Sequence, residues 1–259
     1  MVVAFTTLRG GPAAAFSTMG AGLLVVAVLM ALVGLPISLT LLAFVCWIPA
    51  AISAEVLRST TSLAAAVGII ALLALSAVLA LLALQSPMEA FWQAALDQFK
   101  SLFNTLLESG GESLSAPMAE LKDELLLALL QSGAGISLLI FCTAGLFLAR
   151  SGQAKLFNPG GFQKEFHSLY FGKQVGIFCV GLIGVGFLVG GALGITLTIV
   201  ALYPLLLQGL AIIHALVKQR SLGVGWLVAL YFLLVYLQPL MILISVFGFI
   251  DNIRRLPRH

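Results

Sequence analysis

Residues 174–217 read QVGIFCVGLIGVGFLVGGALGITLTIVALYPLLLQGLAIIHALV and contain no Lys, Arg, Asp or Glu. A membrane-spanning helix needs about 20 consecutive apolar residues to cross roughly 30 Å of hydrocarbon. This stretch is therefore long enough for two crossings, and its two adjacent glycines, Gly190 and Gly191, indicate a hinge between them. The sequence predicts helices over 174–189 and 191–217.

The same absence of charge recurs along most of the chain, over residues 10–54, 59–88, 125–149 and 221–250. Of the 259 residues, 61% are hydrophobic and 9% are charged, whereas a soluble domain carries about 25% charged residues. So few charged side chains cannot cover a surface exposed to water, and we expect lipid to cover it instead. The predicted fold is all-α, a polytopic transmembrane helical bundle that forms a single membrane domain.

Residues that break helices divide the uncharged runs into seven predicted spans. Gly34, Leu35 and Pro36 supply a tight turn within the first run. A break at Gln238 and Pro239 in the last run would give eight spans instead. The seven predicted helices cover residues 16–33, 36–56, 62–84, 125–149, 174–189, 191–217 and 223–250.

Residues 85–124 form the only substantial polar insert. Within it, apolar residues recur at three- and four-residue spacing with Glu89, Asp97 and Lys100 between them, which is the pattern of an amphipathic helix. We expect this helix to lie in the membrane interface or to cross it in part. Its apolar positions are Met88, Phe91, Trp92, Ala95, Phe99, Leu102, Phe103 and Leu106.

The distribution of basic residues predicts an orientation, because short cytoplasmic loops are enriched in Lys and Arg. A cytoplasmic N-terminus places most Lys and Arg inside, against Lys100 and Lys122 outside. Seven spans would leave Arg254, Arg255 and Arg258 outside, which the same rule disfavours, and eight would return them to the cytoplasm.

Several classes of function lack support in the sequence. The formal net charge is only +3 and its basic residues form no stripe, so nucleic-acid binding is not expected. Cys46, Cys142 and Cys179 stand alone inside apolar runs, which favours packing roles over a disulfide or a zinc site. We predict no metal and no cofactor.

The sequence also lacks the residues and motifs that catalysis or ion-coupled pumping would need. His214 is the only titratable acid or base inside an uncharged run, whereas pumps and intramembrane hydrolases place such groups there despite their cost. The sequence contains no GxxxxGK[ST], HExxH or GxSxG motif. We therefore expect a protein that is not an enzyme.

Polar residues in the last two predicted helices are candidates for ligand binding. Tyr203 and His214 are eleven residues apart and share a helix face, and Gln208 lies on the same helix. Tyr231 and Gln238 are aligned two turns apart on the last helix. These five residues would either line a ligand pocket or hydrogen-bond one another and hold the helices together.

The loop LFNPGGF, residues 156–162, is the most distinctive local motif. Pro followed by Gly suits a type II turn, and Phe162, Phe166, Leu169 and Tyr170 would form one face of the helix that follows. We expect either a docking patch or a turn with a solvated interfacial helix. The candidate patch residues are Asn158, Pro159, Gly160, Gly161, Glu165 and His167.

Four segments of the chain resemble the YybS-like family of bacterial polytopic membrane proteins: PAAISAEVLR, LFNPGGFQKEF, LLLQGLAIIHALVKQR and GFIDNIRR. That family is distantly similar to the S components of energy-coupling-factor transporters. The resemblance implies a multi-pass protein of the bacterial plasma (inner) membrane with a cytoplasmic basic tail. It also implies a small ligand bound among the helices and a separate ATPase module, with Ala27 and Ala31 as a small-xxx-small contact for the coupling subunit.

Three functional hypotheses follow from the sequence. The first is a non-catalytic membrane protein that binds a small molecule or lipid for transport and depends on partner proteins for energy. The second is a membrane scaffold or envelope assembly factor that acts through helix–helix and loop contacts. The third is an enzyme acting on lipid, for which only His214, Glu165 and His167 would be available as acid or base.

Overall fold

A computed structural model describes residues 1–34, 41–84, 86–108 and 122–255. The part so described is all-helical, as predicted, and contains ten helices. These are α1 (Val2–Val33), α2 (Leu41–Thr60), α3 (Leu63–Ala83), α4 (Glu89–Glu108), α6 (Asp123–Phe157), α7 (Gly161–His167), α8 (Lys173–Val189), α9 (Gly191–Gln219), α10 (Gly225–Tyr236) and α11 (Gln238–Arg254).

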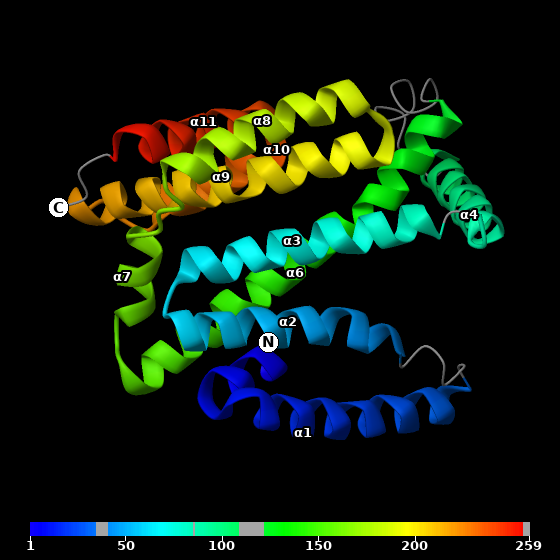
Figure 1. Cartoon of the computed structure of the whole chain (residues 1–259), viewed down its shortest axis with the longest axis horizontal. Helices are drawn as coiled ribbons and strands as arrows, with labels where there is room; N and C mark the ends of the chain where they lie inside the picture. The colour runs from blue at the N-terminus through cyan, green and yellow to red at the C-terminus, as the bar shows by residue number, and fades with distance from the viewer. Residues whose placement is uncertain (35–40, 85, 109–121, 256–259) are drawn as a thin grey trace.

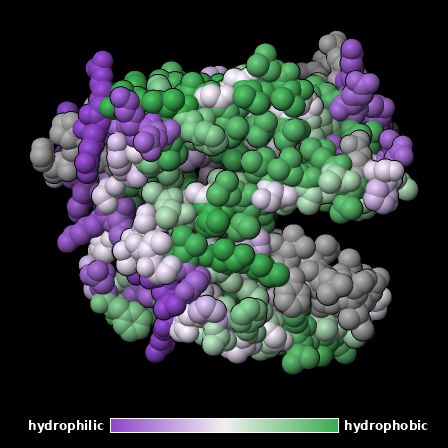
Figure 2. Space-filling model, viewed as in Figure 1, coloured by the Kyte–Doolittle hydropathy of each residue, from purple (hydrophilic) through white to green (hydrophobic). Residues whose placement is uncertain are grey.

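The long helices lie lengthwise across the view of Figure 1, and α6 crosses them obliquely. The short helix α7 runs across one end of this bundle, and α4 lies at the other end. Figure 2 shows hydrophilic residues gathered toward these two ends with a hydrophobic surface between them. This distribution is the one expected of a bundle whose middle faces acyl chains.

Four of the described helices are long and apolar enough to cross a membrane, namely α1, α3, α6 and α9. Helices α10 and α11 form a bent pair, and they would make a fifth span if the two together cross the membrane once. The predicted total of seven or eight spans is therefore not confirmed. Helix α8 is apolar, but its 17 residues are fewer than the 18 required of a span here. The side chains at the start of α2 lie outside the described part of the chain.

The first helix is longer than predicted. It begins at Val2 instead of residue 16 and is kinked at Gly11, whose φ is 73° and ψ is −165°. A left-handed φ suits glycine, and the Pro12 that follows cannot donate to the helix ladder. The kink also leaves room for Arg58 of α2, since a Cβ at Gly11 would lie 3.4 Å from the Arg58 guanidinium carbon.

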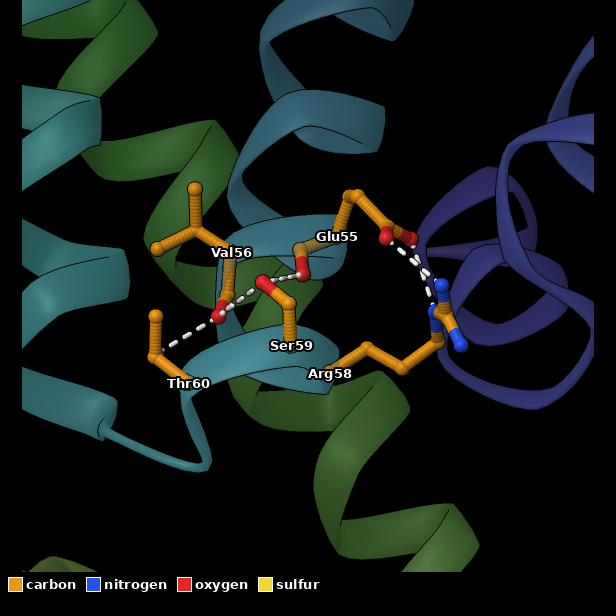
Figure 3. Close-up of polar contacts among 5 residues, drawn as sticks. All are labelled: Glu55, Val56, Arg58, Ser59 and Thr60. Carbon is orange, nitrogen blue, oxygen red and sulfur yellow. Dashed lines mark hydrogen bonds and ion pairs between the residues drawn. The ribbon is translucent and has the colours of Figure 1, made fainter.

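Arg58 lies at the polar end of α2, which Figure 3 shows. Its guanidinium donates to both carboxylate oxygens of Glu55, at 2.8 and 2.7 Å. Ser59 and Thr60 donate back to backbone carbonyls of the same turn. Both hydroxyls therefore find acceptors within α2 itself.

The break in the final predicted helix lies at Leu237, beside the predicted Gln238 and Pro239. It bends the chain by 118° between α10 and α11. The end of α11 returns to the loop after α7, because the Tyr170 hydroxyl donates to the Asn252 carbonyl at 3.3 Å and the Arg255 guanidinium lies over the Tyr170 ring. Tyr231 and Gln238 are therefore not aligned on one helix, which corrects the prediction.

Glycines allow the closest helix contacts. A Cβ at Gly209 of α9 would lie 2.1 Å from the Ile244 carbonyl oxygen of α11. A Cβ at Gly248 of α11 would lie 1.9 Å from the Leu205 carbonyl oxygen of α9. Across the hinge between α8 and α9, Gly186 and Gly194 approach in the same way. Small residues at such crossings let backbones pack where no hydrophobic force drives helices together.

Helix α4 confirms that the polar insert forms a helix. Among its predicted apolar positions Trp92 is buried, whereas Phe91 and Leu102 are exposed. Lys100 forms a 2.6 Å ion pair with Asp123 at the start of α6. This contact joins α4 to α6 at the end of the bundle opposite α7.

Candidate functional site

A cavity of about 560 Å³ lies between α6, α7, α9 and α10. This volume falls within the range of roughly 300–1,000 Å³ that is typical of small-molecule sites. Three of the five predicted ligand-binding residues, Tyr203, His214 and Tyr231, line it together. The other lining residues are Ile140, Thr143, Ala144, Phe147, Phe162, Gln163, Phe166, His167, Leu207 and Leu210.

His214 joins two walls of the cavity. Its Nε2 atom lies 2.9 Å from the hydroxyl oxygen of Tyr231, which links α9 to α10. The edge-to-face contact between the His214 and Phe166 rings, at 5.3 Å, adds α7. His167 lies beside them, with its ring 6.4 Å from that of His214. Both imidazoles therefore reach the same end of the cavity.

Three phenylalanines form an aromatic wall between α6 and α7. The ring of Phe147 meets Phe162 at 5.5 Å and Phe166 at 5.6 Å, in both cases edge to face. Phe162 and Phe166 themselves lie one helical turn apart, with stacked rings. Such contacts fix the aromatic faces and leave a rigid apolar surface toward the cavity.

The LFNPGGF loop sets the position of α7. Gly160 has φ 82° and ψ −6°, and the Gly161 N–H donates to the Asn158 carbonyl at 2.9 Å. This is the predicted type II turn, with Pro159 at its second position. Asn158, Pro159 and Gly160 are exposed at the polar end of the bundle.

A second restraint on α7 comes from Glu165. Both of its carboxylate oxygens accept from the Arg150 guanidinium of α6, and Arg150 also donates to Gln153 at 2.6 Å. Glu165 is thus committed to holding α7 against α6, a structural role that the docking-patch prediction did not include. His167, from the same predicted patch, lines the cavity instead.

The cavity is largely apolar and carries no Lys, Arg, Asp or Glu among its lining residues. Two of its lining residues, Ile140 and Ala144, are exposed near the middle of the apolar helix α6. The arrangement suits an apolar molecule with a hydrogen-bonding group at the imidazole end.

Gln208 and Gln238 do not line this cavity. Gln208 is fully buried on another face of α9, where its amide donates to Asp251 of α11 and its oxygen accepts from the Phe171 N–H at 3.1 Å. Gln238 is exposed at the start of α11. Gln208 therefore makes a polar contact between helices with Asp251, a partner that the sequence analysis did not predict.

The proposed coupling contact lies on the second half of α1. Ala31 is exposed and Ala27 is half-buried there. Their neighbours Leu24, Val28 and Leu32 are also exposed, so this half of α1 presents an apolar surface to lipid or to another helix.

Sequence reasoning missed one of the three residues of the aromatic wall. Phe147 lies inside an uncharged run that predicted only a span, although Phe162 and Phe166 were expected on one helix face. Cys142 and Cys179 are buried, as expected of packing residues, and Cys46 lies outside the described side chains. Within the described ranges, no group of three His, Cys, Asp or Glu side chains could hold a metal ion.

The model of one protein family, described as predicted membrane protein (DUF2232), matches residues 1–252. Neither a curated protein nor a solved structure matches the chain.

Proposed function

The chain belongs to the DUF2232 family of predicted membrane proteins, and we propose that it is a non-catalytic protein that binds an amphipathic small molecule or lipid between α6, α7, α9 and α10. The observation that carries this proposal is the convergence of Tyr203, His214 and Tyr231 on one cavity of about 560 Å³.

The chemistry of the lining indicates how such a ligand would bind. Phe147, Phe162 and Phe166 offer apolar ring surface for an acyl or ring system. Tyr203, Tyr231 and Gln163 can exchange hydrogen bonds with hydroxyl or carbonyl groups. Because no formally charged side chain lines the cavity, we propose an uncharged polar group at the imidazole end.

The proposed route of entry is lateral, from the membrane. The exposed Ile140 and Ala144 border the cavity on α6, which is an apolar helix of 35 residues. A lipid could enter there without leaving the hydrocarbon layer, which avoids the cost of solvating its chain.

The resemblance to YybS-like proteins and to S components extends this proposal to transport. A separate ATPase module would supply energy from the cytoplasmic side of the bacterial plasma membrane, where we place the N-terminus and the LFNPGGF loop. Ala27 and Ala31 would then contact the coupling subunit.

Photo-cross-linking tests the binding proposal. Membranes that contain the protein would be irradiated with a fatty alcohol bearing a diazirine in its chain, and the labelled peptides would be identified by mass spectrometry. We expect saturable labelling of peptides from α6, α9 and α10 that unlabelled fatty alcohol competes away. Labelling spread evenly over all lipid-facing helices would contradict the proposal.

A scaffold function is the alternative, and the exposed apolar half of α1 favours it. Leu24, Val28 and Leu32 would pack against another membrane protein in that case. Replacing Ala27 and Ala31 with Leu would abolish co-purification of a partner under either function, so labelling of the cavity distinguishes them. If the diazirine probe does not label the cavity of the unmodified protein while a partner still co-purifies with it, the scaffold function is favoured.

A further inference from the structure

Helices α1 and α2 meet at two places and leave an apolar groove between them. At the polar end of α2, the Arg58 guanidinium lies beside the kink at Gly11 of α1. Eleven residues earlier in α2, the Trp47 ring covers Gly22 of α1, where a Cβ would lie 2.7 Å from it. A groove of about 280 Å³ lies between α1 and α2, and its walls include Phe16, Met19, Ile48 and Ile52.

The lining of this groove suits an acyl chain. Ile48 lies seven residues before Glu55, and both line the groove, so it runs about 10 Å along α2 from the polar end toward the apolar middle. Phe16 and Ile52, on opposite walls, are 73% and 38% exposed, so the groove borders the outer surface of the bundle. In a membrane that apolar surface meets acyl chains, and a chain laid in the groove stays within the hydrocarbon.

A carboxylate stands at the polar end of the groove. Among the described residues that line it, Glu55 alone carries a formal charge, and its side chain is 29% exposed. The Arg58 guanidinium donates to both Glu55 oxygens, which keeps the carboxylate ionised. Figure 3 shows both side chains turned toward α1. The two charges therefore lie where the head group of a lipid in the groove would lie.

The Glu55–Arg58 pair can bind one further group on each side. An ionised carboxylate has about four lone-pair sites, of which Arg58 uses two. The guanidinium uses Nε and Nη2 on Glu55, which leaves Nη1 to donate elsewhere. A head group that carries both a primary ammonium and a phosphate complements both charges, because the ammonium donates to Glu55 and the phosphate accepts from Arg58. An anionic head group without an amine complements Arg58 only.

We propose that the groove between α1 and α2 binds a phospholipid with a primary amine in its head group, as in phosphatidylethanolamine. One acyl chain lies against Phe16 and Ile52, the ammonium donates to Glu55, and the phosphate accepts from Arg58. The lipid fills the space between the two places where α1 meets α2. This site is separate from the cavity between α6, α7, α9 and α10, because the two share no lining residue.

Photo-cross-linking with a series of head groups tests the proposal on the full chain. The probe is phosphatidylethanolamine with a diazirine in one acyl chain, added to the purified protein in detergent, and we expect saturable labelling of peptides from α1 and α2. Unlabelled phosphatidylethanolamine should compete at about tenfold lower concentration than phosphatidylglycerol, which has no amine. Phosphatidylcholine should fall between them, because its quaternary ammonium has the charge but no N–H. Equal competition by either of these lipids, or no labelling of α1 and α2, would overturn the proposal.

Three variants locate the contacts, and a monodisperse size-exclusion profile shows that each is folded. Glu55→Gln keeps the size of the side chain but removes its charge, so it should lose the preference for phosphatidylethanolamine over phosphatidylglycerol. Glu124→Gln, at an exposed acid near the start of α6, should keep it. Ile52→Trp fills the groove and should abolish labelling of α1 and α2. A preference that persists in Glu55→Gln, or labelling that persists in Ile52→Trp, would contradict the proposal and leave fatty-alcohol labelling of the first cavity unaffected.

Discussion

The Nε2 atom of His214 lies 2.9 Å from the hydroxyl oxygen of Tyr231, and this contact joins α9 to the short helix α10. The two residues are 17 positions apart, and the chain between them passes through the polar end of the bundle. The contact therefore closes one side of the cavity and places a hydrogen-bonding pair at the end of an apolar space.

Tyr231→Phe should weaken ligand binding because it removes the hydroxyl but keeps the ring. One hydrogen bond contributes about 1 kcal/mol, so the dissociation constant for the diazirine probe should rise about fivefold. Dose-dependent labelling measures this constant. Gln238→Leu is the control and should bind as the unmodified protein does; equal losses in both variants would argue against a specific role for Tyr231.

Gly209→Ala should destabilise the bundle, since its Cβ would lie 2.1 Å from the Ile244 carbonyl oxygen. Overpacking of this kind costs about 1–3 kcal/mol. Thermal unfolding in detergent, followed by size-exclusion chromatography, would show a lower melting temperature. Gly181→Ala is the matched control on α8, because a Cβ there meets no atom within 4 Å. A melting temperature that is the same in both variants would contradict the packing of α9 against α11.

The Arg150–Glu165 ion pair should stabilise the position of α7. Its side chains are 23% and 29% exposed, so we expect a coupling energy between that of a surface pair and that of a buried pair, about 1–2 kcal/mol. A double-mutant cycle with Arg150→Gln and Glu165→Gln measures it through unfolding in detergent. Additive effects of the two changes would show that the pair does not hold α7 to α6.

Both ends of the α10–α11 pair should lie on the same side of the membrane as the LFNPGGF loop. Arg255 already contacts Tyr170, which follows α7. In a background without native cysteines, Arg254→Cys and Lys155→Cys should react with an impermeant maleimide from one side, and Ser86→Cys from the other. Reaction of Arg254→Cys together with Ser86→Cys would mean that α10 and α11 cross as one span.

The sequence predicted the helices and part of the site because both depend on local patterns. Absence of charge located the apolar helices, and the eleven-residue spacing of Tyr203 and His214 placed both on the cavity face of α9. The spacing from Tyr203 to Gln208 corresponds to about 140° around a helix, which turns Gln208 away. Its partner Asp251 was not predicted, because burial of an acid against α9 depends on tertiary packing.

The N-terminal part of α1 was also not predicted, because it too depends on tertiary packing. Gly10, Gly11 and Pro12 resemble a helix boundary, yet the structure keeps helix on both sides of a kink at Gly11. Arg58 fills the space beside the kink, and its position there follows from the packing of α2, which sequence patterns do not encode.

Native mass spectrometry of the purified protein tests the occupancy of the cavity most directly. We predict a bound hydrophobic molecule that survives transfer from detergent and is lost in Ala144→Trp, whose new side chain fills the cavity mouth on α6. Ala80→Trp, at an exposed position on α3, should retain it. An adduct of equal abundance in all three proteins, or none in the unmodified protein, would contradict a ligand site between α6, α7, α9 and α10.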